Sequence, residues 1–305
     1  MIRTCFAAAL AAAALTLFLP APAALALDPL NRTTTVTFHV ADANLDIPAV
    51  VSIPTPDAPN LRDGARPVMF VMHTCAGMGI SEDRGNAYQP LAEEASWFRM
   101  RGFVTIMPDS FAPRDALDVC AAQDVMPADR AEDLFAIARQ LDTIEGVKLD
   151  RSRIYAVGYS HGGQAVVEAA AMQVPETFEG PRLQGIISYY PDCASLTNVG
   201  ALDLAPADLV LLLGERDKWA DTEVCVRAVE KRGDPKHVRA FVFPDVTHGF
   251  NLRMKDPRAY GHTIDSRLGG ILTTSPGQFA YNQNAAEAAR GVVRDYLREK
   301  GFTMD

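Results

Sequence analysis

The sequence predicts an α/β fold in which helices cover both faces of a mostly parallel central β-sheet. Runs typical of β-strands alternate along the chain with runs of helical periodicity, as a parallel sheet requires. Residues 68–72 read Val-Met-Phe-Val-Met, an apolar run expected of a strand that is covered on both faces. Of the 305 residues, 48% are hydrophobic and 22% are charged, which is typical of a globular protein and excludes a disordered chain.

The first 26 residues have the pattern of a secretory signal peptide. Arg3 precedes an apolar run over residues 6–19, and Ala24-Leu25-Ala26 forms a cleavage signal. An uncleaved membrane anchor is the alternative, but the run is short for one. No internal repeat or linker divides the remaining chain. We therefore expect an exported protein, periplasmic or secreted, with a single domain over residues 27–305.

The secondary-structure elements can be predicted in chain order from local patterns. Residues 33–40 alternate polar and apolar side chains, as in a half-buried strand, and Pro127 suits the first turn of a helix. Gly301 suits the end of the last helix. Strands are expected at residues 33–40, 48–53, 68–72, 103–107, 153–157, 183–190, 208–213 and 238–243. Helices are expected at residues 93–101, from 127 onward, and at 164–171, 222–231 and 285–300.

The most informative stretch is residues 158–162, which read Gly-Tyr-Ser-His-Gly between an expected strand and an expected helix. A serine on such a sharp turn has its hydroxyl thrust outward, and the flanking glycines let other backbone segments approach closely. The following helix points its N-terminus at the site, where it can stabilise negative charge. The pattern predicts that Ser160 is a nucleophile; a tight glycine turn with a solvated serine is the alternative.

A nucleophilic serine needs a base and a group that orients that base. Asp217 and His248 each follow the end of an expected strand, so both belong at the edge of the sheet where Ser160 lies. The chain order serine, aspartate, histidine is the order of α/β-hydrolases. Asp217 is the best candidate for the acid. Its competitors are Asp192, Asp221 and Asp245.

An acyl-transfer site also needs two N–H donors for the oxyanion. The amide of His161, directly after Ser160, is expected to supply one. The loop after residues 68–72 is expected to supply the other, and Cys75 is the candidate. His73, at the end of the same strand, is expected to brace this loop.

Four cysteines follow the signal peptide: Cys75, Cys120, Cys193 and Cys225. An even number in an exported chain predicts two disulfides, with three possible pairings. Their spacing lacks the Cys-x-x-Cys signature of zinc sites, so no metal is expected. The formal net charge of −9 argues against nucleic acids and anionic membrane surfaces as partners.

These motifs resemble those of the dienelactone hydrolase family of α/β-hydrolases over nearly the whole mature length. The resemblance is carried by residues 71–77, 107–111, 158–163, 214–217, 248–250 and 281–289. It implies hydrolysis of small-molecule esters or lactones without a cofactor. Ser160 stands where the founding enzymes have cysteine, and Thr74 stands where they have a glutamate that restrains that thiol. The joint absence of the cysteine and the glutamate is consistent, because a serine activated by His248 does not need a group that restrains a thiol.

The resemblance also implies finer features. Strand neighbours in this fold imply the disulfides Cys75–Cys120 and Cys193–Cys225. Arg114 and Arg253 each stand one position later than the arginines that bind a substrate carboxylate in the family. The alternative is that they are surface arginines paired with Asp115 or Asp256. The segment 252–279 is longer than in the compact family pattern and is expected to form a wall or flap over the site.

Two further functions remain as alternatives to an exported esterase. Related folds include small exopeptidases, although those usually carry an additional domain for which this chain has no room. A non-catalytic binding protein that kept the fold is the other alternative, and an intact triad is poor support for it. The sequence does not predict the oligomeric state.

Overall fold

The computed structural model describes residues 32–78, 88–120, 124–173, 178–198, 207–253, 262–265, 271–274 and 279–305. The expected signal peptide lies outside these residues. Eight strands form the main sheet in the order β1-β2-β4-β3-β5-β6-β7-β8. β1, β2 and β4 pair antiparallel, and every other pair is parallel. The strands are β1 (Thr33–Val40), β2 (Leu45–Ser52), β3 (Ala65–Met72), β4 (Val104–Pro108), β5 (Lys148–Tyr159), β6 (Leu183–Tyr189), β7 (Asp208–Gly214) and β8 (Val238–Phe243).

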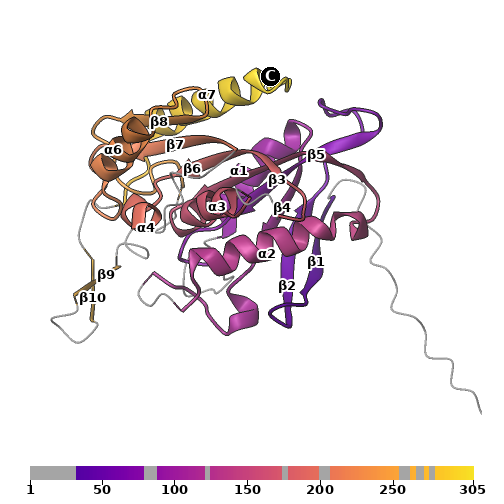
Figure 1. Ribbon diagram of the computed structural model, residues 1–305, viewed down its shortest axis with the longest axis horizontal. Helices are drawn as coiled ribbons and strands as arrows, with labels where there is room; N and C mark the ends of the chain where they lie inside the picture. Colours follow the sequence, from indigo (N-terminus) through magenta and orange to yellow (C-terminus); the bar gives the residue numbers. More distant parts are fainter. Residues whose placement is uncertain are drawn as a thin grey trace, which may run out of the picture.

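Helices cover both faces of this sheet, which confirms the predicted fold class (Figure 1). One face packs against α2 (Pro127–Arg139), α3 (His161–Met172), α4 (Cys193–Asn198) and α6 (Thr222–Arg232). The other face packs against α1 (Tyr88–Met100) and α7 (Gln283–Glu299). The position of β3 between these two layers explains why its residues 68–72 are all apolar. Val68 and Phe70 pack toward α2 and α3, whereas Met69 and Val71 pack toward α1 and α7.

Sequence patterns located the ends of these strands and long helices to within five residues, with the starts of α1 and β5 expected five residues too late. They did not predict α4, nor the two-stranded antiparallel sheet of β9 (His262–Asp265) and β10 (Ile271–Thr274). A disulfide joins Cys193 at the start of α4 to Cys225 in α6. Among the described residues, none of the helices combines the length and the hydrophobicity of a transmembrane segment.

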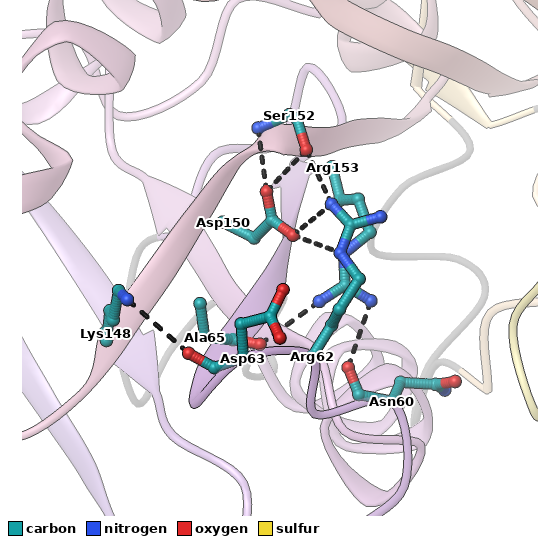
Figure 2. A network of polar contacts seen from close by, with 8 residues as sticks. All are labelled: Asn60, Arg62, Asp63, Ala65, Lys148, Asp150, Ser152 and Arg153. Carbon is teal, nitrogen blue, oxygen red and sulfur yellow. Dashed lines mark hydrogen bonds and ion pairs between the residues drawn. The ribbon is translucent and has the colours of Figure 1, made fainter.

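A polar network fixes the amino end of β5 to the loop before β3 (Figure 2). Asp150 accepts hydrogen bonds from Arg62 Nη2 at 2.6 Å and Arg153 Nε at 2.7 Å. Ser152 donates to the other carboxylate oxygen from both its amide and its hydroxyl. Arg153 also donates to the carbonyls of Asn60 and Ala65. These bonds hold the start of the strand whose far end carries Ser160.

Candidate active site

Ser160 lies at the turn between β5 and α3, in a backbone conformation that is unusual for a residue with a side chain. Its φ is 55° and its ψ is −119°. A Cβ on Gly158 would lie 2.0 Å from the carbonyl oxygen of Gly162, and a Cβ on Gly162 would lie 2.3 Å from the carbonyl oxygen of Met72. Only glycine allows these close approaches, so the two flanking glycines make the sharp turn possible.

The structure brings Ser160, Asp217 and His248 together. His248 Nε2 is 2.9 Å from Ser160 Oγ, and His248 Nδ1 is 2.6 Å from Asp217 Oδ2. The side chains of His248 and Asp217 are 2% and 1% exposed. Because an ionised carboxylate can only accept, the Nδ1–H of His248 donates to Asp217. Nε2 is then the nitrogen that can accept a proton from the serine hydroxyl.

Asp217 is held by backbone donors as well as by His248. Its Oδ1 accepts hydrogen bonds from the amides of Trp219 at 2.8 Å and Ala220 at 2.9 Å. The competing carboxylates have other partners. Asp192 accepts from Ala194 and Ser195, Asp221 caps the start of α6, and Asp245 pairs with Arg216.

Aromatic rings enclose the imidazole of His248. The ring of Tyr190 lies 4.5 Å away between centroids, that of Phe279 5.0 Å and that of Trp219 5.9 Å, the last in a stacked arrangement. Burial among rings keeps the histidine in one orientation. Sequence reasoning did not find these three residues, because each lies in a loop without a motif.

Ser160 faces a small pocket with a cavity volume of about 20 Å³. Its walls include Cys75, Cys120, Tyr190, Leu252 and Phe279. Both ends of the segment 252–279 therefore contribute to the wall. The side chains between them, including those of β9 and β10, lie outside what the structure describes, so the expected flap stays a prediction.

The loop that carries Cys75 is braced beside this pocket. A disulfide links Cys75 to Cys120, and the amide of Val119 donates to the carbonyl of Cys75 at 2.8 Å. Both disulfides implied by the family resemblance, this one and Cys193–Cys225, are present in the structure. His161 begins α3 directly after Ser160, so the two expected oxyanion donors come from adjacent elements.

The two arginines expected to bind a substrate carboxylate are not among the described residues that line this pocket. Arg114 donates to both carboxylate oxygens of Asp133, at 2.8 and 3.0 Å, and to the carbonyl of Ser110. Its guanidinium fork is thus already engaged with a carboxylate, which argues against the expected role. Its partner is Asp133 and not Asp115. The residue proposed as partner of Arg253, Asp256, lies outside the described residues.

Arg253 lies in a second cleft, between α1 and α7. Its Cζ atom lies over the ring of Tyr281, 5.0 Å from the ring centroid. A buried network lies between this cleft and the pocket. Tyr190 Oη donates to Asn251 Oδ1 at 2.7 Å, and Asn251 Nδ2 and Arg290 Nη2 donate to Glu94 Oε1 at 3.4 and 2.9 Å. Burial raises the pKa of Glu94, and the charge of Arg290 opposes that shift. The network fixes Tyr190 beside His248.

Within the described ranges, no group of histidine, cysteine, aspartate and glutamate side chains is arranged to hold a metal ion. The arrangement instead supplies a hydroxyl, a base within reach of it and a carboxylate that orients the base. Such an arrangement can support nucleophilic acyl transfer.

Comparison with solved structures finds the same fold. A candidate dienelactone hydrolase from Klebsiella pneumoniae is 16% identical, with a TM-score of 0.61 over 88% of this chain and 99% of that chain. Esterase 2 from Thermogutta terrifontis, phosphorylated by paraoxon, is 16% identical, with a TM-score of 0.60 over 90% of this chain and 96% of that chain. A dienelactone hydrolase-like promiscuous phosphotriesterase from metagenomic libraries is 15% identical, with a TM-score of 0.61 over 88% of this chain and 98% of that chain.

At the level of sequence, no curated protein matches this chain significantly. The sequence profile of the dienelactone hydrolase family, however, matches residues 61–300. That range contains Ser160, Asp217, His248 and Cys75 and most of the main sheet. It confirms the resemblance drawn from the motifs: this chain belongs to the dienelactone hydrolase family.

Proposed function

We propose that the protein is an exported serine hydrolase that cleaves carboxylic esters or lactones through an acyl-enzyme. The observation that carries the proposal is the continuous contact from Ser160 Oγ through the His248 ring to Asp217, at 2.9 and 2.6 Å. Membership of the family supports hydrolysis of esters. Ser160 takes the place of the cysteine nucleophile of the founding enzymes.

In the proposed reaction, Ser160 Oγ attacks the carbonyl carbon while His248 Nε2 accepts the hydroxyl proton. The negative charge on the carbonyl oxygen is stabilised by the amides of Cys75 and His161. His248 then returns the proton to the leaving alcohol, which leaves an acyl ester on Ser160. A water molecule, deprotonated by His248, attacks this ester and releases the acid. Asp217 holds the imidazole in the required tautomer and stabilises its cationic form.

The lining of the pocket supports a small apolar acyl group. The space beside Ser160 is narrow, and the walls formed by Tyr190, Leu252 and Phe279 are largely apolar. A panel of p-nitrophenyl esters of increasing chain length, simple lactones and aminoacyl amides tests this. We expect acetate and propionate esters to give the highest kcat/KM; a preference for the amides would support an exopeptidase instead.

Export is supported by the two disulfides, which persist in oxidising compartments. Together with the signal-peptide pattern of residues 1–26, they favour the periplasm or the extracellular medium. Amino-terminal sequencing of the exported protein should find a chain that begins at Leu27.

The nucleophile itself is tested by covalent labelling. We expect a fluorophosphonate probe, and paraoxon as in the Thermogutta esterase, to modify Ser160 and to abolish ester hydrolysis. Ser160→Ala should remove both labelling and activity, a loss on the order of 10⁴-fold or more in rate. Ser195→Ala, which removes a hydroxyl that bonds only to Asp192 in the described structure, is the control and should keep both. Full activity in Ser160→Ala would contradict the proposal.

A further inference from the structure

One arginine is completely buried beside the turn that carries Ser160. Arg130, on α2, has 0% of its surface exposed. Its Nη1 donates to His161 Nδ1 and its Nη2 donates to the carbonyl oxygen of His73, both at 2.8 Å. Its Cζ atom lies over the ring of Phe111, 5.0 Å from the ring centroid. Burying an arginine is costly, and its Nε has no hydrogen-bond partner among the described residues, so this position calls for a specific role.

The two acceptors belong to the two segments that carry the proposed oxyanion donors. His161 directly follows Ser160 and begins α3, and His73 follows β3 two residues before Cys75. The two segments touch beside the arginine, because a Cβ on Gly162 would lie only 2.4 Å from the carbonyl oxygen of His73. Arg130 therefore bridges the loop after β3 and the turn after β5 with one rigid group.

The contacts of Arg130 are unusual for a buried cation. None of the ion pairs in the described part of the chain includes it, and both of its bonds go to neutral acceptors. The neighbouring carboxylate of Asp133 is bonded to both ends of the Arg114 fork instead. Burial lowers the pKa of Arg130 to about 9, so the group is still charged at neutral pH.

The protonation of His161 fits this arrangement. Because arginine can only donate, Nδ1 of His161 must accept, and its ring proton is on Nε2. Burial, and then the charge of Arg130, lower the pKa of His161 to about 3. His161 is therefore a neutral acceptor whose ring orientation is set by Arg130, and its backbone amide is one of the proposed oxyanion donors.

We propose that Arg130 is a positioning residue for the hydrolase: its two-point hold on His161 and His73 sets the separation and orientation of the amides of His161 and Cys75. This inference rests on the proposed function. Planar two-point bonding is specific to a guanidinium, so lysine cannot replace it. The guanidinium does not touch the substrate. It acts through the backbone of the two segments that do.

The experiment compares two buried arginines. Arg130→Met removes the bridge, whereas Arg66→Met removes another buried arginine, which donates to the carbonyls of Thr55, Pro56, Ala58 and Pro59 away from the site. Both variants should unfold at lower temperature. For each variant, kcat is divided by the fraction of protein whose Ser160 reacts with the fluorophosphonate probe. Only Arg130→Met should lower this corrected kcat, by about 10²-fold, because a shift of about 1 Å in a catalytic group has an effect of this size.

A second readout separates positioning from general destabilisation. A boronic acid that forms a tetrahedral adduct with Ser160 places an oxygen where the oxyanion forms. In Arg130→Met its affinity should fall by about the same factor as kcat/KM, with little change in the KM for the ester. Arg130→Lys should retain the charge but behave like Arg130→Met. Wild-type kcat in either Arg130 variant would overturn the inference.

If the Arg130 variants do not fold, substitutions of His161, which accepts a hydrogen bond from Arg130, test the inference instead. His161→Leu keeps the backbone amide but removes the acceptor, and should lose kcat as Arg130→Met does. His161→Gln supplies a carbonyl oxygen to Arg130 and should recover most of it. Wild-type kcat in His161→Leu would overturn the inference. An inactive, unlabelled wild-type protein would instead contradict the proposed function, and the inference with it.

Discussion

At the scale of single residues, the candidate site depends on a strained serine between two glycines that have no room for a side chain. Ser160 is in a positive-φ conformation that costs of order 1–3 kcal/mol and persists because the surrounding structure imposes it. Its amide donates to the carbonyl of Tyr189 at 3.0 Å, and its carbonyl accepts from Gln164 at 3.0 Å. These bonds fix the turn from both sides, while the neighbouring glycines provide the space.

Gly162 gives the sharpest test of this arrangement. In Gly162→Ala the new methyl group would lie 2.3 Å from the carbonyl oxygen of Met72, so α3 must move away from β3. We expect a loss of roughly 1–3 kcal/mol in the free energy of unfolding, measured by denaturant titration, and a drop in kcat. Gly291→Ala, in α7, is the control. Its methyl group would meet only Arg294 Nη2 at 3.8 Å, and it should be neutral or stabilising. Equal effects of the two substitutions would refute the steric explanation.

At the scale of elements, β5 connects the candidate nucleophile at one end of the strand to a stabilising polar network at the other. Its carboxyl end presents Ser160, and its amino end is bonded through Asp150 to the loop before β3. Burial alone would raise the pKa of Asp150, but hydrogen bonds from Ser152, Arg153 and Arg62 outweigh it and hold the pKa well below its ordinary value. Nine residues of extended strand lie between Asp150 and Ser160, a distance of about 30 Å along the strand.

Substituting Asp150 should therefore affect stability without affecting chemistry. Asp150→Ala leaves Arg62, Arg153 and Ser152 without their shared acceptor, and should lower the free energy of unfolding by roughly 1–3 kcal/mol at neutral pH. The difference from wild type should shrink as the pH falls through the low folded-state pKa, because the protonated carboxyl no longer accepts as well. Asp142→Ala removes an exposed partner of Arg151 and should have little effect. A large loss of kcat in Asp150→Ala would contradict this separation.

At the scale of the whole molecule, two buried histidines beside the candidate site are neutral in the folded chain. His73 and His161 are both buried, and burial followed by the charge of Arg130 lowers the pKa of each below the usual value. The unfolded chain binds protons on these histidines near pH 6.5, whereas the folded chain does not. The stability they permit is therefore present at neutral pH and decreases as the pH falls.

Comparing wild type with His161→Gln measures this linkage. Between about pH 6 and pH 4 the wild-type free energy of unfolding should fall more steeply, by up to about 1.4 kcal/mol per pH unit, because one proton is taken up on unfolding. Arg130 and the carbonyl of Val125 face this ring with opposite effects on its pKa, and burial outweighs the carbonyl. His39→Gln, at an exposed histidine, is the control. Parallel pH profiles for wild type and His161→Gln would show that His161 is not neutral in the fold.

Most of the fold could be predicted because its signals are local. Strand alternation, the apolar run of β3 and the glycine after α7 each depend on a few neighbouring residues. The positions of Ser160, Asp217 and His248 followed from the same logic, since parallel strands bring their carboxyl ends to one edge of the sheet. The hairpin of β9 and β10 was missed because its short strands lack such a pattern.

The sequence by itself determined the α/β architecture, the nucleophile motif and the candidates for its partners. Only the tertiary structure decided that Arg114 pairs with Asp133, that Arg130 bridges His73 and His161, and that Glu94 meets Arg290 across 196 residues. Periodicity and turn signals report which face of an element is buried, but not which side chain of another element lies opposite. A buried charge takes its partner from three-dimensional packing, and that information is spread over the whole chain.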